Sequence, residues 1–468
     1  MVFSSITFIY YFLPLVLVGY FLTPNRYKNY TLLISSMAFY YAGEPIFILL
    51  LLGTVLANYA FGLLIEKYHS DQKFNHSKRV LILAVTTNVL FLGIFKYANF
   101  FAENFSALLN VDLKWTSIAL PIGISFYTFQ IMSYVIDVYR GEVKAQKNPF
   151  YLALYVSLFP QLIAGPIVRY QTIADEIESR SHSYEDFAYG VKRFTTGLIK
   201  KVVIANPLGE LWNLTQQSDQ PSVLLYWLGA VGFMLQIYYD FSAYSDMGIG
   251  MGRMFGFHFL ENFNYPYVSR SITEFWQRWH MSLGTWFKDY LYIPLGGNRT
   301  TTVKWIRNIA IVWLTTGFWH GAQWNFLLWG ACFGVILVLE KWLKVNQLPR
   351  AIAHLYTLTI LLFSFVLFNS NSVADAGIYL SNMLGLNALP SMNAESIYYV
   401  DSYKVLLLIA ILCATPLFKN AVLAFRAKQP SFHRVISNFE PLVLVSLLLV
   451  ATGYIVDSSF NPFLYFRF

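Results

Sequence analysis

A histidine interrupts an apolar stretch near the middle of the chain. His320 lies in TGFWHGAQWNF (316–326), within a segment, 309–339, that is otherwise almost wholly apolar. An ionisable residue at membrane depth is costly unless it faces a cavity or a partner, although imidazole can stay neutral near pH 7. A neutral histidine bonded to a backbone carbonyl between helices would explain the residue. Its polar neighbours favour a general base that lines a water- or substrate-filled tunnel: Thr315, Thr316, Gln323 and Asn325.

A second histidine lies among aromatic residues. His280 occurs in SITEFWQRWHMSLGTWFKDYLYIPLGGNR (271–299). As one helix from about Thr273, this segment places His280 on a face with Trp276, Leu283 and Phe287. An interfacial amphipathic helix explains the aromatic residues but not the imidazole. We therefore expect His280 to position a substrate or the first histidine.

Two acids lie at or inside a further apolar segment, in QIYYDFSAYSDMGIG (236–250). Asp240 and Asp246 either end a membrane span at an interface or form the polar wall of a pocket, and the residues alone leave both interpretations open. Gly248, Gly252 and Gly256 follow at a spacing of four, which is typical of closely packed helices and not of a dinucleotide site.

Several common catalytic signatures are missing from the sequence. It has no G-x-S-x-G elbow, P-loop, H-E-x-x-H motif or metal-ligand spacing, so we expect no metal and no tightly bound cofactor. Cys332 and Cys413 both lie in apolar runs, which predicts small buried side chains. A transferase with this sequence would have a base but no obvious nucleophile of its own.

The composition indicates which elements must hold these residues. The 468-residue chain is 56% hydrophobic and only 12% charged, which predicts an all-α polytopic membrane protein embedded in the lipid bilayer. Its net charge of +8 fits the basic bias of cytoplasmic loops and excludes a nucleic-acid footprint. Thirteen apolar segments are candidate transmembrane or re-entrant helices: 5–23, 29–42, 46–65, 79–101, 117–137, 148–168, 188–206, 223–243, 305–321, 323–342, 353–369, 402–418 and 436–456.

Loop charges predict how the chain is oriented. Lys and Arg gather in 66–79, 139–147, 341–350 and 418–434, which we place in the cytoplasm. The acidic segments 209–221 and 370–401 then lie outside. A further segment, PQLIAGPIVRY (160–170), has two prolines and is too broken for a straight helix, which predicts a re-entrant loop.

The combined blocks resemble the signatures of the membrane-bound O-acyltransferases. They are PQLIAGPIVRY, QIYYDFSAYSDMGIG, NFNYPYVSRSITEFWQRWHMSLGTWFKDYLYIPLGGNR and WLTTGFWHGAQWNFLLWG, and the likeness is greatest to the membrane subunits that O-acetylate bacterial alginate. The resemblance spans nearly the whole chain. It implies one domain over 1–468, with N-terminal spans in 1–147, a core with the histidines in 148–342 and C-terminal spans in 343–468. It also implies a ring of about 11–13 transmembrane or re-entrant helices around a central tunnel.

The resemblance also implies roles for individual residues. His320 matches the catalytic histidine of the family, and His280 matches its second, supportive histidine. The residues expected to bind substrate or line the tunnel are Asp240, Tyr244, Asp246, Trp319 and Asn325. The donor would be cytoplasmic acetyl-CoA, and the acceptor would be an extracytoplasmic hydroxyl.

We therefore expect an O-acetyltransferase in a bacterial inner membrane. The missing nucleophile suggests an extracytoplasmic acetyltransferase partner with its own serine, which would pass the acetyl group to an exopolysaccharide such as alginate. Two alternatives remain open at this point. One is a D-alanyl transfer subunit for teichoic acid, and the other is a non-enzymatic transporter or scaffold of polysaccharide export.

Overall fold

The computed structural model describes residues 2–111, 115–162, 165–428 and 430–457. Within these ranges the chain forms helices, turns and loops but no strand, so the predicted all-α fold is confirmed. The chain divides into two compact units. Unit 1 comprises Met1–Phe194 and Ser245–Leu260, and unit 2 comprises Thr195–Tyr244 and Glu261–Phe468. The division into 1–147, 148–342 and 343–468 stays a prediction.

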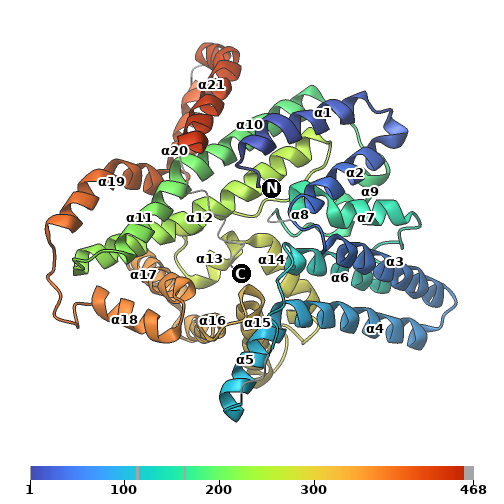
Figure 1. Ribbon diagram of the computed structural model, residues 1–468, viewed down its shortest axis with the longest axis horizontal. Helices are drawn as coiled ribbons and strands as arrows, with labels where there is room; N and C mark the ends of the chain where they lie inside the picture. Colours follow the sequence, from blue (N-terminus) through green and yellow to red (C-terminus); the bar gives the residue numbers. More distant parts are fainter. Residues whose placement is uncertain (1, 112–114, 163–164, 429, 458–468) are drawn as a thin grey trace. The chain divides into compact units, whose positions relative to one another are not determined.

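The helices are labelled in chain order (Figure 1). Those that begin in unit 1 are α1 (Leu13–Leu22), α2 (Lys28–Tyr41), α3 (Ile48–Ser70), α4 (Phe74–Leu92), α5 (Ala98–Leu109), α6 (Ile124–Arg140), α7 (Pro149–Ser157), α8 (Phe159–Leu162), α9 (Tyr170–Glu178) and α10 (Tyr184–Ile199). Those that begin in unit 2 are α11 (Asn206–Gln216), α12 (Val223–Met254), α13 (Ile272–Arg278), α14 (Met281–Phe287), α15 (Thr302–His320), α16 (Trp324–Leu343), α17 (Arg350–Asn369), α18 (Val373–Met383), α19 (Ala394–Cys413), α20 (Leu417–Lys428) and α21 (Pro430–Asp457). Four π-helical segments adjoin them: η1 (Thr7–Phe12), η3 (Gly93–Tyr97), η4 (Lys200–Ala205) and η6 (Lys288–Tyr292).

In the described part of the chain, seven helical segments are long and apolar enough to cross a membrane. They are Ile48–Ser70, Phe74–Leu109, Val223–Met254, Trp324–Leu343, Arg350–Asn369, Ala394–Cys413 and Phe439–Asp457. Each overlaps a predicted span, and the chain is a multi-pass membrane protein. The other predicted spans give helices that are too short, too polar or interrupted.

The span predicted over 148–168 is wrong because the helix breaks inside it. α7 ends at Ser157, and Pro160 is the second residue of α8. A proline has no N–H to donate to the carbonyl four residues earlier, so α7 cannot continue through it. Residues 165–168 are buried without forming a helix, which agrees with the irregular backbone predicted for 160–170. Residues 163–164 of that segment lie outside the described ranges.

α12 is longer than the span predicted over 223–243. It continues past that segment to its end in unit 1. Close packing helps to hold this second half, since a Cβ on Gly248 would come too near the carbonyl of Pro160. Asp240 and Asp246 therefore lie inside a continuous helix, and the interpretation that they end a span is wrong.

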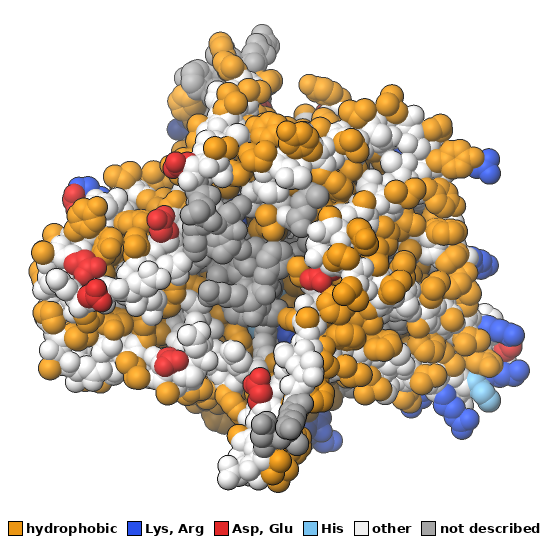
Figure 2. All heavy atoms as spheres, viewed as in Figure 1, with side chains coloured by type: hydrophobic (Ala, Val, Ile, Leu, Met, Phe, Trp, Pro, Cys, Tyr) orange, Lys and Arg blue, Asp and Glu red, His pale blue; other side chains and the backbone are white. Residues whose placement is uncertain are grey.

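In unit 1, α3 and α4 pack side by side and are joined by a short loop (Figure 1). The side chains of Asn58 and Asn88 exchange two hydrogen bonds, of 3.0 and 2.7 Å, between these helices. Polar side chains paired in this way connect helices in lipid. Figure 2 shows hydrophobic side chains over the outward surface of both helices, with basic side chains at the loop between them.

The two cysteines lie on the outside of unit 2, so their predicted burial is wrong. Cys332 on α16 and Cys413 on α19 are both exposed. Lipid chains are as apolar as leucine, so a membrane helix can be apolar on its outer face as well as on its packed face. Apolar neighbours in the sequence therefore do not distinguish the core from the lipid boundary.

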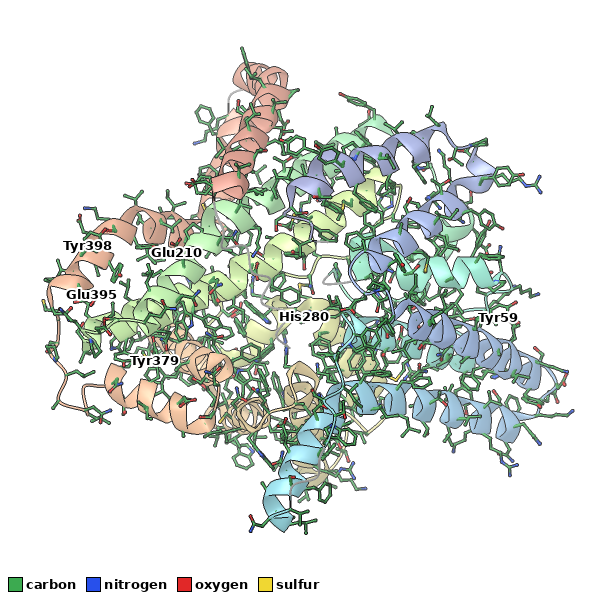
Figure 3. All side chains as sticks on the ribbon, in the orientation of Figure 1. Tyr59, Glu210, His280, Tyr379, Glu395 and Tyr398 are labelled. Carbon is green, nitrogen blue, oxygen red and sulfur yellow. The ribbon has the colours of Figure 1, made fainter. Side chains whose placement is uncertain are left out.

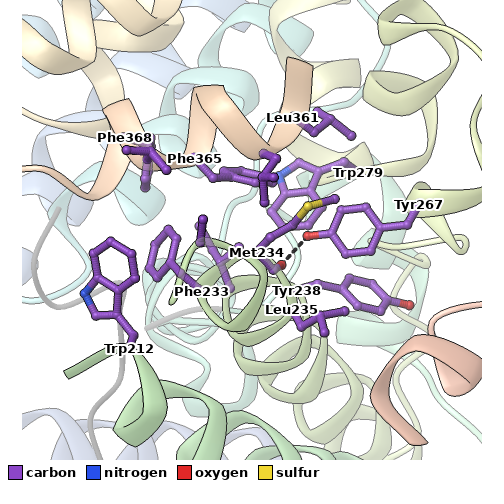
Figure 4. Close-up of a cluster of buried hydrophobic side chains, with 14 of the residues drawn as sticks. Trp212, Phe233, Met234, Leu235, Tyr238, Tyr267, Trp279, Leu361, Phe365 and Phe368 are labelled. Atoms are coloured by element: carbon purple, nitrogen blue, oxygen red, sulfur yellow. Dashed lines mark hydrogen bonds between the residues drawn. The ribbon is translucent and has the colours of Figure 1, made fainter. Parts of the chain in front are cut away.

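The core of unit 2 is rich in aromatic side chains, and Figure 4 shows those from α11, α12 and α17 together with Tyr267 and Trp279. Trp279 packs against Phe275 and Phe365, with ring centroids 5.4 and 5.6 Å away. The Tyr267 hydroxyl donates to the backbone carbonyl of Met234 inside this cluster, which satisfies its polar atom. This core supports the segment that carries His280.

Candidate active site

His280 joins two short helices, so the single helix predicted over 273–287 is wrong. α13 and α14 meet at this residue, whose φ of +45° lies in the left-handed region. In a continuous helix the Met281 N–H would donate to the carbonyl of Gln277. It donates instead to the backbone carbonyl of Asn262, at 2.9 Å. A second segment of unit 2 thus takes over the hydrogen bond that would have continued the helix.

Asn262 also determines which ring nitrogen of His280 carries the proton. Its Oδ1 accepts from the backbone N–H of Ser282 at 3.2 Å and from the Ser282 hydroxyl at 2.9 Å. A backbone N–H can only donate, so the atom that it meets is the amide oxygen. The same oxygen lies 3.2 Å from His280 Nδ1. Nδ1 therefore donates, and Nε2 carries the lone pair in the neutral ring.

His280 remains neutral at ordinary pH. It is 1% exposed and lies outside the seven candidate spans. Burial lowers its pKa well below the ordinary value of 6.5, and the nearby His320 lowers it further. A neutral imidazole with its lone pair on Nε2 can accept a proton or a hydrogen bond at that atom.

His320 is the last residue of α15 and is 4% exposed. Three aromatic rings stand edge-on to its imidazole: those of Trp319, Trp329 and Phe368, with centroids at 5.0, 5.2 and 5.4 Å. The histidine predicted to be costly in an apolar run is therefore enclosed mainly by aromatic surface.

Two glycines hold α15 against α16. A Cβ on Gly317 would collide with the carbonyl of Phe326, and a Cβ on Gly330 would collide with the carbonyl of Trp313. Backbone atoms cannot rotate away as side chains can, so only glycine permits this approach. The contact fixes the last turn of α15, and with it His320.

The structure brings the two predicted histidines together. The ring of Trp319 lies 6.1 Å from that of His280 and 5.0 Å from that of His320, centroid to centroid. His320 also acts on the pKa of His280, which requires the two rings to be close.

A cavity of about 1090 Å³ within unit 2 reaches His280 (labelled in Figure 3). Thr316, one turn before His320 on α15, also lines it. Other lining residues include aromatic, polar, acidic and basic side chains: Trp276, Trp305, Trp313, Thr273, Gln277, Glu340, Lys288, Lys341 and Lys344.

The three lysines mark the open end of this cavity. Lys288, Lys341 and Lys344 are exposed, whereas His280 is buried. Lys341 Nζ also lies 3.9 Å from the centroid of the Trp305 ring, a cation–π contact at the cavity wall. The entrance is therefore cationic, the walls combine aromatic and aliphatic side chains with polar ones, and a neutral imidazole lies at the buried end.

Comparison with known proteins gives the family to which this site belongs. A sequence profile of MBOAT, the membrane-bound O-acyltransferase family, matches residues 45–370. The chain belongs to this family. The resemblance read from the motifs is thus confirmed, and the protein is a membrane-bound O-acyltransferase.

Several bacterial proteins are similar to this acyltransferase over most of their length. It is 43% identical over 380 residues to the probable alginate O-acetylase AlgI of Azotobacter vinelandii, covering 80% of this chain and 76% of that protein. It is 44% identical over 383 residues to the probable alginate O-acetylase AlgI of Pseudomonas aeruginosa, covering 80% and 73%. It is 32% identical over 518 residues to the peptidoglycan O-acetyltransferase of Helicobacter pylori, covering 100% and 98%.

The acyltransferase pairs each of its two α12 acids with a cation. In unit 2, Asp240 lies 2.6 Å from Lys201 of η4, and both side chains are 2% exposed. In unit 1, Asp246 lies 2.6 Å from Arg193 of α10. These ion pairs connect α12 to the preceding helical segments.

The remaining predicted residues are buried elsewhere in unit 2. Tyr244 is 1% exposed on α12, and the Trp319 ring contacts the rings of both His280 and His320. The Asn325 amide donates to the carbonyl of Ser370 at 2.8 Å, which joins α16 to the end of α17. None of these three, and neither of the α12 acids, lines the cavity that reaches His280. Their binding roles stay predictions.

Two polar residues of the acyltransferase site were missed in the sequence. Asn262 was passed over because it stands in a non-helical segment 18 residues before His280. Glu340 is an isolated acid at the end of an apolar helix, a signal that could have been noticed. Its carboxylate accepts the N–H groups of Ile272 and Thr273 at 2.5 and 2.9 Å, so it caps α13 together with the Ser271 hydroxyl. Among the described residues, no three His, Cys, Asp or Glu side chains are grouped to hold a metal ion.

Proposed function

We propose that this acyltransferase moves an acetyl group from cytoplasmic acetyl-CoA to an extracytoplasmic hydroxyl, with His320 as the general base. The main support is the cavity of unit 2, which runs from three exposed lysines to His280 and comes within one turn of His320. CoA is an anionic nucleotide with a long neutral arm that ends in the thioester. Its phosphates suit the lysines, and its arm suits the mixed aromatic, aliphatic and polar walls.

The charge of the loops supports a cytoplasmic donor. Lys341 and Lys344, at the entrance, belong to the basic segment 341–350 that the loop charges place in the cytoplasm. The acidic segments 209–221 and 370–401 are placed on the opposite side by the same rule. Figure 3 labels two of their acids, Glu210 and Glu395, in unit 2.

The chemistry needs a base and a positioned partner. The acceptor hydroxyl oxygen would attack the thioester carbonyl while His320 takes its proton, so that a C–O bond forms. The C–S bond then breaks, and the CoA thiolate leaves and takes up a proton from the imidazolium. His280, with its lone pair on Nε2, would hold the hydroxyl or the neighbouring imidazole. General-base catalysis of this kind contributes about 10²–10⁴-fold.

The names of similar proteins suggest the acceptor of the acetyl group. Similar proteins are named for O-acetylation of alginate or peptidoglycan, so the final acceptor in our proposal is a polysaccharide hydroxyl outside a bacterial inner membrane. Because the sequence lacks a nucleophile elbow, the acetyl group would pass first to the serine of an extracytoplasmic partner acetyltransferase.

D-Alanyl transfer is the second candidate within the same family. The chain is 27% identical over 270 residues to the teichoic acid D-alanyltransferase of Bacillus subtilis, covering 53% of this chain. The acetyltransferases are more similar and cover more of the chain, which favours acetyl transfer. Transport or scaffolding without chemistry would not require two adjacent buried imidazoles beside a cavity.

Labelled acetyl-CoA tests the proposal. The purified full-length protein should release or transfer label, His320→Ala should lose nearly all turnover, and His280→Ala should keep a measurable fraction. His69→Ala is the matched control, since His69 is exposed at the end of α3. Background turnover in the unaltered protein, equal to that of His320→Ala, would refute a stand-alone enzyme. A folded but fully inactive His280→Ala would reverse the order of the two histidines.

A further inference from the structure

Unit 1 carries a cluster of cations that the proposed reaction does not use. Lys28 Nζ, at the start of α2, lies 5.0 and 5.5 Å from the ring centroids of Tyr20 and Phe21. The guanidinium carbon of Arg180 lies 5.5 Å from the same Tyr20 ring. Across the described ranges, no carboxylate forms an ion pair with Lys28 or Arg180.

Arg180 is held firmly by groups that do not neutralise it. Its Nε donates to the Tyr20 hydroxyl at 2.8 Å and to the Phe255 carbonyl at 3.0 Å. Its Nη1 donates to Asn29 Oδ1 at 2.6 Å and to the Glu176 backbone carbonyl at 3.2 Å. The third nitrogen, Nη2, is buried and makes no hydrogen bond. These hydrogen bonds therefore fix the position of the Arg180 guanidinium, but among the described residues no carboxylate balances its charge.

The positive charges in this cluster repel one another. Burial, and then the charge of Arg180, lower the pKa of Lys28. Burial, and then the charges of Lys28 and Arg180, lower the pKa of His182, which lies beside them. A bound anion would reduce this repulsion and favour the protonated forms of Lys28 and His182.

A small pocket of about 260 Å³ opens beside the cluster. His182, Ser183 and Arg253 supply its polar wall, and its apolar wall consists of Phe21, Tyr184, Phe187 and Met254. Arg253 is paired with Asp186 at 2.6 Å, so it adds little net charge. His182 connects the pocket to the cations, because its Nε2 lies 2.8 Å from the Tyr20 hydroxyl that Arg180 also binds.

The apolar wall of the pocket continues onto the surface of the unit. Leu22 and Tyr184 are 79% and 83% exposed beside it. Met254 is the last residue of α12, a candidate membrane span, so the pocket lies at the end of a candidate span. Its volume is below the roughly 300 Å³ of the smallest typical drug-sized sites, which suits a headgroup better than a nucleotide.

We propose that this pocket, with Lys28 and Arg180, binds the phosphate of an anionic phospholipid. The phosphate would lie against the Lys28 ammonium, close to the positive charge of Arg180, while the Ser183 hydroxyl keeps its hydrogen bond to the Asp186 carboxylate at 2.9 Å. The lipid chains would then run along Phe21 and the exposed apolar residues. Basic pockets between membrane helices recognise the headgroups of anionic lipids in this way. Lipid binding here is independent of acyl transfer.

Native mass spectrometry of the full-length protein tests this site. The protein is released from vesicles of equal parts phosphatidylglycerol and phosphatidylcholine, and retained lipid is counted. We expect a preference for phosphatidylglycerol, and about a fivefold loss of it in Lys28→Gln, since one cation near a lipid surface contributes roughly 1 kcal/mol. Lys78→Gln, which removes an exposed cation of α4, is the control and should retain lipid normally.

Two results would overturn the lipid site. One is equal retention of the two lipids, or equal retention of phosphatidylglycerol by the unaltered protein and a folded Lys28→Gln. The other is displacement of phosphatidylglycerol by inorganic phosphate or free CoA, which would make the ligand a soluble phosphate. Arg180→Lys keeps the positive charge but loses the planar guanidinium with its several N–H donors. It should retain more lipid than Arg180→Gln at matched thermal stability.

Discussion

His280 depends on Asn262 for the side of the ring that carries the proton. Asn262→Asp keeps the oxygen that accepts the Ser282 N–H but adds a negative charge beside Nδ1. That charge stabilises the imidazolium and raises the pKa of His280. We expect the ratio of acetyl transfer at about pH 6 to that at about pH 8 to fall by roughly tenfold compared with the unaltered protein. The measurement is a pH–rate profile for both proteins.

The sign of this effect follows from burial. Because burial lowers the pKa of His280, its neutral form contributes stability that is present above the ordinary value of 6.5 and lost as pH falls through the lower folded value. Asn262→Asp should bring the folded-state pKa of His280 closer to its ordinary value. Asn262→Leu should instead slow the reaction at every pH without moving the acid limb. If the acid limb of the pH–rate profile is the same in Asn262→Asp as in the unaltered protein, Asn262 supports the backbone only.

At the scale of single residues, the sequence was informative where a residue type was out of place. His320 and His280 were found because imidazole is costly in apolar or aromatic segments. Asn262 was missed because its role depends on tertiary contacts to a residue at a helix break. No helical or strand period relates such positions, so no pattern could predict the contact.

At the scale of elements, the contact between α15 and α16 should control the placement of His320. Gly330→Ala places a Cβ against the carbonyl of Trp313, which overpacks the interface at a cost of about 1–3 kcal/mol. A shift of about 1 Å in His320 would lower turnover by roughly 10²-fold. Turnover and thermal unfolding should be measured together. Gly377→Ala on α18 is the control, because nothing lies within 4 Å of its added Cβ, and full turnover in Gly330→Ala would contradict the expected shift.

The buried pair between α12 and η4 gives a second test at this scale. Asp240→Leu or Lys201→Met alone leaves a charge buried without its ion-pair partner, at a cost of about 3–5 kcal/mol. The double variant removes both charges and should recover most of that loss in chemical or thermal unfolding. If the recovered double variant is still inactive, Asp240 acts in substrate binding as well as in folding. An unrecovered double variant would show that the pair is not the main contact.

Helix type was predictable from composition, but helix length was not. Apolar content identifies segments compatible with lipid, and all seven candidate spans overlap predicted ones. The break at Ser157 follows from the nearby Pro160, whereas the break at His280 and the extension of α12 depend on Asn262 and on the packing of Gly248 against Pro160. Those partners are distant in sequence, so tertiary contacts override the local period.

At the scale of the whole molecule, family and reaction class could be reached from the sequence, whereas the cavity with lysines at its entrance came from the structure. Lys288, Lys341 and Lys344 stand at the open end of one cavity, although α15 and most of α16 lie between the first and the other two in sequence. Reversing their charge in Lys288→Glu/Lys341→Glu/Lys344→Glu should raise KM for acetyl-CoA by about tenfold with kcat little changed, since exposed ion pairs are each worth about 0.2–1 kcal/mol.

The donor itself provides the matched control for this entrance. S-Acetylpantetheine carries the thioester arm without the nucleotide phosphates, so its KM should be nearly the same for the triple variant and the unaltered protein. Added salt should also narrow the difference seen with acetyl-CoA, because exposed charges are screened within about 10 Å at 0.1 M ionic strength. Lys404→Glu, an exposed cation of α19 that does not line the cavity, should leave both KM values unchanged. Equal rises in KM for both donors would mean that the lysines shape the cavity instead of binding phosphate.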